Sequence, residues 1–214
     1  LLYNNNIKNL LFLGKINRPS LEDFVLDGEI DQYISKITKS FKKGDGSILS
    51  SVLEIFIAKG FKILSPQSIS KKYFFQKNEL NKFLSKNNKY DKNKSIKILN
   101  DLSKYDNAQS IVIIKGYIIA IECAEGTDEL LKRVFSIRKE LGQIRIKEGL
   151  LTKIPKKSQS KLIDLPVIGV KTLKLINKAN LDGIAINPKL TIVNNKEEFL
   201  KYAHENNLKI YSIT

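Results

Sequence analysis

The stretch QSIVIIKGYIIAIECAEGTDELLKR, residues 109–133, decides the fold of the larger part of the chain. Two runs rich in isoleucine and valine flank Lys115 and Gly116, and this pattern predicts a tight β-hairpin. From residue 127 onward, apolar side chains recur at helical spacing, so we expect a helix directly after the second strand. A strand that leads into a helix in this way is typical of an α/β protein.

Strand and helix patterns also alternate in the part of the chain that precedes this stretch. We expect a strand within residues 9–19, helices that end at Gly44 and Gly60, and a strand at 61–66. The second of these helices has Ser47 as its expected N-cap. Together these elements predict part of a parallel sheet, an incomplete Rossmann-like domain.

Residues 71–94 are rich in lysine and asparagine, which predicts a surface connection and a domain boundary near residue 74. The prediction is therefore two α/β domains, an N-terminal Rossmann-like domain (1–74) and a C-terminal catalytic domain (75–214) with a mixed sheet and helices.

The pattern after the boundary predicts further elements of the second domain. We expect helices at 94–105 and 170–183, the latter closed by Gly183, and a strand, strand, helix, strand order after it. Residues 149–169 contain two prolines and small polar residues, so we expect a loop with little regular structure there. Loops of this length in a compact domain are often functional.

The composition excludes some classes of protein. With 214 residues, 42% of them hydrophobic, the chain can bury a core. No apolar run reaches the roughly 20 residues that span a bilayer, and a single cysteine excludes an internal disulfide and favours a reducing compartment. The net charge is +15, but only four of the 37 basic residues are arginine. Because arginine is the usual residue for phosphate and base recognition, a solvated lysine surface is the favoured interpretation.

Three carboxylates, Glu122, Glu125 and Asp128, follow the second strand of the predicted hairpin, and we call residues 122–128 the acidic turn. Thr127 or Asp128 can cap the next helix, whose first turn exposes N–H groups and a positive dipole end. Such an end binds phosphate, and carboxylates beside it can hold Mg²⁺ together with phosphate oxygens. The alternative, a plain helix cap beside a solvated Glu125, stays open.

Asp164 precedes Pro166 among apolar residues, so we expect it in a buried or half-buried segment. An aspartate there needs a partner, which can be a metal, a lysine or a backbone cap. Lys153, Lys156 and Lys157 lie upstream and can contact a diphosphate as mobile point charges. A turn aspartate beside exposed lysines is the alternative.

The turn KKGDGS, residues 42–47, can cradle an anion through its backbone N–H groups, although it lacks the spacing of a P-loop. A helix entry with a serine cap is the alternative. His204, the only histidine, is expected on a solvated helix surface. Since neither a Ser/His/Asp arrangement nor zinc spacing occurs, any catalysis would depend on carboxylates, lysines and a metal.

Five segments lie in the same order as in one known family, over about Asn9 to Ile213: FLGKINRP, KKGDGSILSSVLEIFIAKGF, IIAIECAEGTDELLKR, LTKIPKKSQSKLIDLPVIGVKT and LDGIAI. Together they resemble the UDP-2,3-diacylglucosamine pyrophosphatases of the lipid A pathway, in the metal-dependent form of α-proteobacteria and some other Gram-negative bacteria. The pairing of EGTD with a later DLPVIG is the specific feature of the resemblance.

The resemblance implies two α/β domains that bind lipid between them, with Mg²⁺ as the cofactor. It also implies hydrolysis of UDP-2,3-diacylglucosamine to UMP and 2,3-diacylglucosamine 1-phosphate. The implied catalytic residues are Asp164, Glu125 and Asp128, and the implied metal ligands are these three and Glu122. The implied substrate-binding residues are Asn17, Arg18, Gly44, Asp45, Gly126, Thr127, Lys153 and Lys156.

The partners implied are the nucleotide-linked diacyl glucosamine lipid and, transiently, the inner-membrane surface, with no nucleic acid. We therefore expect a cytoplasmic enzyme peripheral to the inner membrane, and a homodimer stays open. Two other functions also stay open, a basic non-catalytic module that binds nucleic acid and another Mg²⁺-dependent nucleotide-sugar enzyme.

Two departures from the family pattern matter. Family members open with a strand and a glycine-rich turn that this chain lacks, and no methionine occurs even at position 1, so we expect an N-terminally truncated chain. The family tends to carry a basic residue two positions before the aspartate, where this chain has Leu162.

Overall fold

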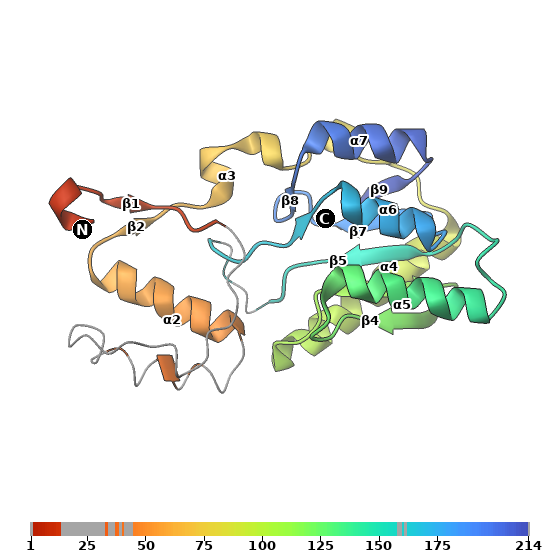
Figure 1. The fold of residues 1–214 in the computed structure, drawn as a ribbon, viewed down its shortest axis with the longest axis horizontal. Coiled ribbons are helices and arrows are strands. Elements are labelled where there is room, and N and C mark those ends of the chain that lie inside the picture. The colour runs from red at the N-terminus through yellow and green to blue at the C-terminus, as the bar shows by residue number, and fades with distance from the viewer. Residues whose placement is uncertain are drawn as a thin grey trace. The chain divides into compact units, whose positions relative to one another are not determined.

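The computed structural model describes residues 2–13, 33, 37, 38, 40, 45–157, 160 and 162–213. They form a mixed α/β protein, as predicted (Figure 1). The chain divides into two compact units, Leu1–Ser70 with Ser158–Asp164, and Lys71–Lys157 with Leu165–Thr214. The predicted boundary lies near residue 74, and the segment 158–164, which the sequence assigned to the second domain, groups with the first unit.

The first unit holds a short parallel strand pair and a long apolar helix. Strand β1 (Asn9–Leu10) pairs in parallel with β2 (Lys62–Ile63), as a parallel sheet requires. The other described elements of this unit are the 3-10 turn η1 (Tyr3–Asn5), α2 (Asp45–Ala58) and α3 (Pro66–Ile69). Phe56 on α2 packs edge-on against Phe12 and Phe61, with ring centroids 5.4 and 5.8 Å apart. These rings anchor the helix to both strands.

The ends of α2 test two predictions. Gly60 has φ +84°, a left-handed conformation that glycine adopts without strain, and it ends the helix as predicted. The predicted N-cap at Ser47 is wrong, because α2 already begins at Asp45 and Ser47 lies inside the helix.

The second unit is built on a five-stranded sheet with the order β4-β3-β5-β7-β9. Its strands are β3 (Ser110–Ile114), β4 (Tyr117–Ile121), β5 (Leu150–Lys153), β7 (Gly183–Ile186) and β9 (Lys209–Ser212). Strand β3 is antiparallel to both of its neighbours, whereas β5, β7 and β9 are parallel. It follows that β4, β5, β7 and β9 all end at one edge of the sheet, which we call the carboxyl edge.

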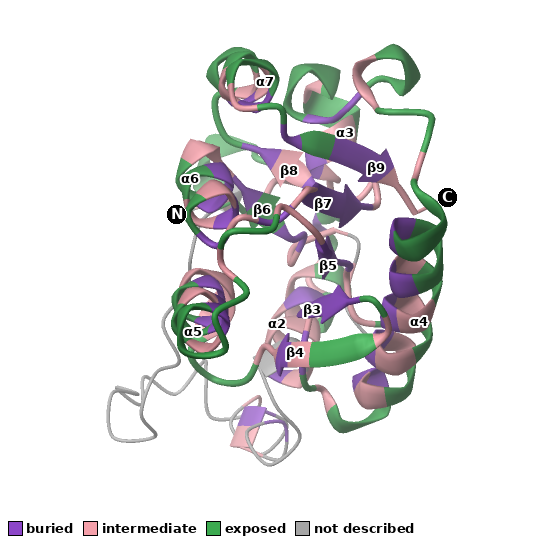
Figure 2. Ribbon diagram, turned by 90° about the vertical axis from the view of Figure 1, so that its right-hand side faces the viewer, coloured by how far each residue is buried: buried purple, intermediate pink, exposed green. Residues whose placement is uncertain are grey.

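Helices cover both faces of this sheet. Helices α5 (Gly126–Glu140), α6 (Val170–Lys178) and α7 (Lys196–Glu205) pack on one face, and α4 (Lys86–Leu102) packs on the other (Figure 2). The remaining elements are η3 (Lys71–Tyr73), η4 (Lys77–Glu79), η5 (Ser103–Tyr105) and the parallel pair β6 (Val167–Ile168) and β8 (Ile192–Val193).

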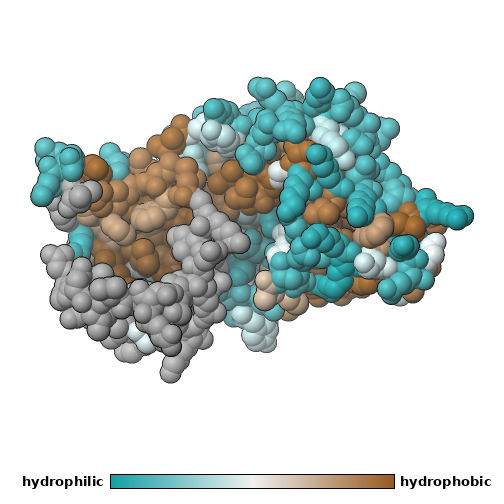
Figure 3. All heavy atoms as spheres, viewed as in Figure 1, coloured by the Kyte–Doolittle hydropathy of each residue, from teal (hydrophilic) through white to brown (hydrophobic). Residues whose placement is uncertain are grey.

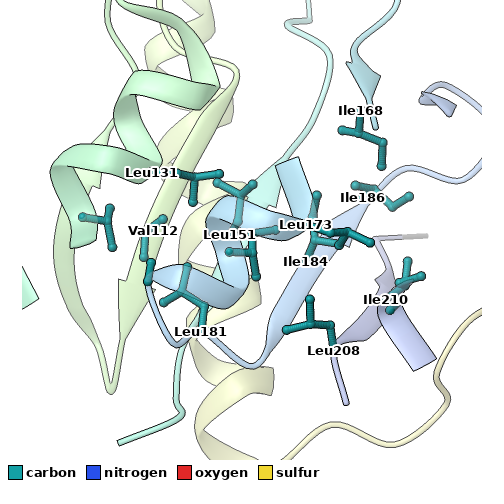
Figure 4. Close-up of a cluster of buried hydrophobic side chains, with 14 of the residues drawn as sticks. Val112, Leu131, Leu151, Ile168, Leu173, Leu181, Ile184, Ile186, Leu208 and Ile210 are labelled. Carbon is teal, nitrogen blue, oxygen red and sulfur yellow. The ribbon is translucent and has the colours of Figure 1, made fainter. Parts of the chain in front are cut away.

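The main core of the second unit lies between the sheet and the three helices. Figure 4 shows side chains from β3, β5 and β7 meeting those of α5 and α6, with Val112, Leu151 and Ile184 on the strands. All three are completely buried. Strands β3, β5 and β7 lie inside the sheet with both faces covered, which explains why β3 and β7 are mainly apolar and why every residue of β5 is buried.

The hairpin prediction is confirmed. Strands β3 and β4 pair antiparallel, and Lys115 and Gly116 between them both have positive φ, +49° and +85°. Two successive left-handed residues are the geometry of the two-residue turn that suits the twist of a hairpin. Helix α5 then follows directly, as expected.

Two predictions for the rest of the unit are wrong. The expected loop at 149–169 contains β5, because Leu150 and Leu151 pair with both β3 and β7 in the centre of the sheet. Gly183 does not close a helix but begins β7. A side chain at Gly183 would collide with the backbone of Lys209 on β9, so the glycine permits close strand packing.

Candidate functional site

Polar side chains gather at the carboxyl edge of the sheet. Lys153 ends β5, Ser110 begins the antiparallel neighbour β3, and the two residues are register partners. Glu122 comes directly after β4, and its N–H donates to the Ser110 carbonyl at 2.9 Å. Ligands of open α/β sheets bind outside the carboxyl ends of the strands, so this edge is the candidate site.

A buried lysine lies at the centre of this cluster. Lys153 is only 6% exposed, and its Nζ donates to Thr127 Oγ1 at 2.6 Å and to Ser110 Oγ at 3.4 Å. The two hydroxyl oxygens are 3.2 Å apart. Thr127 belongs to the first turn of α5, so the lysine joins β5 to the start of that helix. A buried ammonium group held by hydroxyls is a positive charge shielded from water.

Glu122 completes the chain of hydrogen bonds. Thr127 Oγ1 donates to Glu122 Oε1 at 3.2 Å, so the threonine hydroxyl lies between the lysine and the carboxylate. Among the residues that the structure describes, the buried Glu122 Oε2 has no hydrogen-bond partner. An unpaired buried carboxylate oxygen is costly, and such groups mark sites where a ligand, an ion or water completes the shell.

Glu125, at the N-cap position of α5, is held by one cation and by N–H groups. Its carboxylate accepts hydrogen bonds from the Cys123 N–H at 3.0 Å and from Arg133 Nη2 at 2.6 Å. Its own backbone N–H and then Arg133 lower the pKa of Glu125 below its ordinary value. Cys123 itself is exposed.

Asp128 forms an ion pair that links two helix starts. Its Oδ2 lies 2.8 Å from Nζ of Lys171, in the first turn of α6. The hydrogen bond to Asp128 raises the pKa of Lys171. Because the lysine is well exposed, the pair is worth little in stability, but it neutralises one charge of the acidic turn.

Gly126 allows the turn to enter the helix. It has φ +80° at the first position of α5, a conformation that strains any residue with a side chain. The first turn of α5 therefore begins at the carboxyl edge, with N–H groups that have no partner within the helix and a positive dipole end. Together with Lys153, this end is suited to an anionic group such as phosphate.

Two of the three carboxylates of the acidic turn are paired with cations. Glu125 is paired with Arg133 and Asp128 with Lys171. Of the three, Glu122 is the one with a buried oxygen that has no partner in the described part of the chain. In the part of the chain that the structure describes, no three His, Cys, Asp or Glu side chains lie close enough to hold a metal ion. Mg²⁺ binding by Glu122, Glu125 and Asp128 stays a prediction.

Asp164 belongs to the other compact unit, which includes 158–164, and its convergence with the acidic turn stays a prediction. It is half-buried, and its N–H donates to the Ser160 carbonyl at 3.3 Å. Asn17, Arg18 and Gly44 lie outside the described residues, and Asp45 is the first residue of α2.

The remaining lysine prediction concerns the loop after β5. Lys156 Nζ donates to the carbonyl and carboxylate oxygens of Asp106, at 2.6 and 3.0 Å, which fastens that loop to the corner after α4. The structure thus brings together Lys153, Thr127, Gly126 and Glu122, while Lys156 is held at Asp106.

Sequence reasoning missed three residues of the site, Ser110, Arg133 and Lys171. Ser110 is completely buried and contacts Lys153 only because β3 and β5 pair, 43 residues apart in sequence. Arg133 lies eight residues after Glu125, beyond the spacing of three or four at which side chains on a helix are neighbours, so no spacing signal points to this ion pair.

Two other features lie apart from this edge. A pocket of ≈ 330 Å³ lies at the amino end of β9 and against α7, lined by residues that include Glu79, Asn81 and His204. His204 is exposed, as predicted. Within the described residues, no helix is both long and apolar enough to cross a membrane.

The fold and the carboxyl edge define an α/β protein with a cationic, hydroxyl-lined site at a helix start, a class suited to phosphate-containing ligands. Residues 1–73 match the LpxI N-terminal domain and residues 78–211 match the LpxI C-terminal domain. The chain therefore belongs to the LpxI family.

A curated relative supports the same assignment. The chain is 26% identical over 175 residues to the UDP-2,3-diacylglucosamine pyrophosphatase LpxI of Caulobacter vibrioides. The similar region covers 81% of this chain and 62% of that relative, so the match spans less than two thirds of the relative's length.

Proposed function

We propose that this chain hydrolyses the diphosphate bond of UDP-2,3-diacylglucosamine and releases UMP and 2,3-diacylglucosamine 1-phosphate, a step of lipid A biosynthesis. Membership of the LpxI family carries this proposal, since both domains of the family match in order along the chain. The Caulobacter relative bears the name of this activity.

The carboxyl edge supports a phosphate-binding role within this reaction. The proposed task of Lys153 and the first turn of α5 is to bind the diphosphate and to stabilise the negative charge that builds on its oxygens during hydrolysis. Preorganised positive groups in a site shielded from water are well suited to this task, and Lys153 is buried and already hydrogen-bonded.

The proposed task of Glu122 is to orient these groups. Its Oε1 accepts from Thr127, which in turn accepts from Lys153, so the carboxylate fixes the direction of the threonine hydroxyl. Its Oε2, which has no hydrogen-bond partner among the described residues, is available to accept a hydrogen bond from water or to bind a cation. Glu125 is less suited to proton transfer, because a carboxylate with a lowered pKa is a weak base.

Mg²⁺ remains the proposed cofactor, and when bound it would polarise a phosphoryl oxygen as a Lewis acid. Glu125 and Asp128 are each paired with a cation, so the proposal depends on Asp164 and Glu122 as the ligands to be tested. Asn17, Arg18, Gly44 and Asp45 remain proposed substrate-binding residues on the strength of the family resemblance. The proposed location is cytoplasmic, at the inner-membrane surface.

The experiment uses the purified full chain with UDP-2,3-diacylglucosamine and measures release of UMP. Asp164→Asn, which keeps the size of the side chain, is expected to abolish release of UMP. Calorimetric titration of Mg²⁺ into the same variant tests the metal separately from activity, and weaker binding is expected. A matched UDP-sugar without acyl chains is the control substrate.

Two outcomes would overturn the proposal. Unchanged UMP release by Asp164→Asn would remove this aspartate from the reaction. Equal turnover of the substrate without acyl chains would point instead to a water-soluble nucleotide sugar.

A further inference from the structure

Ser110 contacts every member of the chain of hydrogen bonds at the carboxyl edge. Its backbone carbonyl accepts from the Glu122 N–H at 2.9 Å. Its hydroxyl oxygen lies 3.4 Å from Lys153 Nζ and 3.2 Å from Thr127 Oγ1. The residue is completely buried, so these contacts are shielded from water. Ser110 therefore joins the residues to which the proposed function assigns tasks.

The sheet places Ser110 and Lys153 where apolar residues would suit the fold. Side chains alternate along a strand, so Ser110 shares a face of β3 with Val112, which belongs to the core between the sheet and the three helices (Figure 4). Lys153 shares a face of β5 with Leu151 in the same way. The two polar residues are register partners, and they end this apolar face with a hydroxyl and a charge. Polar groups that break a local packing rule are typical of functional positions.

The donors and acceptors allow only one direction for these hydrogen bonds. The ammonium group of Lys153 can only donate, and the carboxylate of Glu122 only accepts. Thr127 has one hydroxyl proton, which it donates to Glu122 at 3.2 Å. The hydrogen bond between the two hydroxyls is then donated by Ser110. The Ser110 oxygen consequently accepts from Lys153, and each hydroxyl has one orientation in this network.

We propose that Ser110 is a positioning residue for Lys153 in the hydrolysis of the diphosphate. That role rests on the proposed function, in which Lys153 stabilises the charge that builds on the diphosphate oxygens. An ammonium group with two hydroxyl partners can donate to a phosphate oxygen while one hydroxyl still orients it. A group that is already oriented need not reorganise as charge develops in the transition state. Ser110 acts through Lys153 and need not contact the substrate.

The test measures UMP release by the full chain at varied concentrations of UDP-2,3-diacylglucosamine, which separates kcat from KM. Ser110→Ala removes the hydroxyl and is expected to lower kcat about tenfold with little change in KM, because the lost interaction matters mainly in the transition state. Ser110→Cys keeps the volume and a weak S–H donor, so its kcat should lie between those of Ser110→Ala and the unchanged chain. It also carries the comparison if Ser110→Ala does not fold.

A double-mutant cycle tests whether Ser110 acts through Lys153. The Lys153→Met background has no ammonium group to position, so Ser110→Ala should change kcat there by less than about twofold. The two substitutions would then be strongly non-additive, as expected for residues that act as a unit. Urea unfolding of the same proteins shows that each is folded under the conditions of the kinetic measurement.

Control variants match both substitutions of the cycle. Ser95 on α4, which packs on the other face of the sheet, is 1% exposed, and among the described residues its hydroxyl has no hydrogen-bond partner. Ser95→Ala removes a buried hydroxyl away from the carboxyl edge and should leave kcat unchanged. Lys201 on α7 has a side chain that is 75% exposed, and Figure 3 shows that the surface over α7 is mostly hydrophilic. Lys201→Gln removes a lysine charge there and should also leave kcat unchanged.

Several results would overturn the role of Ser110: an unchanged kcat for Ser110→Ala, a rise in KM at unchanged kcat, or the same loss of kcat with and without Lys153. A loss for Ser95→Ala as large as for Ser110→Ala would also overturn it, since any buried hydroxyl would then have the effect. If the unchanged chain releases no UMP, the proposed function fails and the role of Ser110 fails with it. All the other results require an active unchanged chain, so the two failures are distinguishable.

Discussion

Two buried cations of the second unit, Arg138 on α5 and Lys153 at the end of β5, have different kinds of partner. Arg138 is completely buried and donates to backbone carbonyls, those of Gln143, Ile146, Glu148, Ala179 and Asn180. Lys153 donates to the side-chain hydroxyls of Thr127 and Ser110.

This difference indicates which of the two cations can form a new hydrogen bond to a ligand. Backbone carbonyls cannot turn away without unfolding of the chain, so Arg138 is fixed and holds the loop before β5 against the end of α6. Hydroxyl groups rotate, so Lys153 can exchange a hydrogen bond for one to a phosphate oxygen. Burial lowers the pKa of Arg138, but a guanidinium remains charged at physiological pH.

The largest effect is expected when Arg138 is replaced. Arg138→Met removes the donors for several buried carbonyls at once, and the free energy of unfolding should fall by about 3–5 kcal/mol. Urea unfolding at neutral pH measures this change. Arg138→Lys keeps the charge but not the planar set of donors, and it should restore only part of the loss. A change below about 1 kcal/mol for Arg138→Met would contradict the structural role.

Replacement of Lys153 should separate stability from activity. Lys153→Met should leave the free energy of unfolding unchanged or raise it, because apolar replacement of a buried ion is often neutral. UMP release should fall by about 10²–10³-fold, the effect of removing one group that stabilises a transition state. Steady-state kinetics measure this, with Lys201→Gln as the control. Full activity of Lys153→Met would show that Lys153, like Arg138, has no role in the reaction.

Loss of the hydroxyl that holds Lys153 should have an intermediate effect. Thr127→Val leaves the buried ammonium with a weaker set of partners, which should cost about 1–3 kcal/mol in the free energy of unfolding. UMP release should also fall. Thr127→Ser keeps the hydroxyl and should recover most of both, as paired unfolding and kinetic measurements would reveal. A loss for Thr127→Ser as large as for Thr127→Val would contradict the role of the hydroxyl.

The exposed ion pair of Glu125 and Arg133 should have the smallest effect. Because the pKa of Glu125 is lower in the folded state, the pair adds stability above the unfolded pKa and loses it as pH falls through the folded value. Urea midpoints from neutral to acid pH should decline less for Glu125→Gln than for the unchanged chain. Added salt should reduce this difference, and identical pH profiles would show that the pair is irrelevant to stability.

Part of the candidate site could be predicted from the sequence. The pattern around Lys115 and Gly116 predicted the hairpin, and the residues after it predicted α5, so the acidic turn was correctly located between a strand and a helix. These features depend on turn geometry and helical spacing, which act over a few residues.

Other parts depend on contacts between distant segments. The sequence of β5 is short and stands before a proline-rich stretch, and only its pairing with β3 and β7 makes it a central strand. The ion pair of Asp128 with Lys171 likewise joins the starts of two separate helices, 43 positions apart in the chain. Neither local spacing nor propensity carries this information.

By itself, the sequence determined the mixed α/β class, the hairpin and the helix that follows the acidic turn, because these elements arise from local backbone preferences. Only the tertiary structure decided that Lys153 is buried against Thr127 and Ser110, and that Glu122 has a buried oxygen with no partner among the residues described. The physical reason is that burial and hydrogen bonding at the carboxyl edge arise when strands far apart in the chain pair with one another.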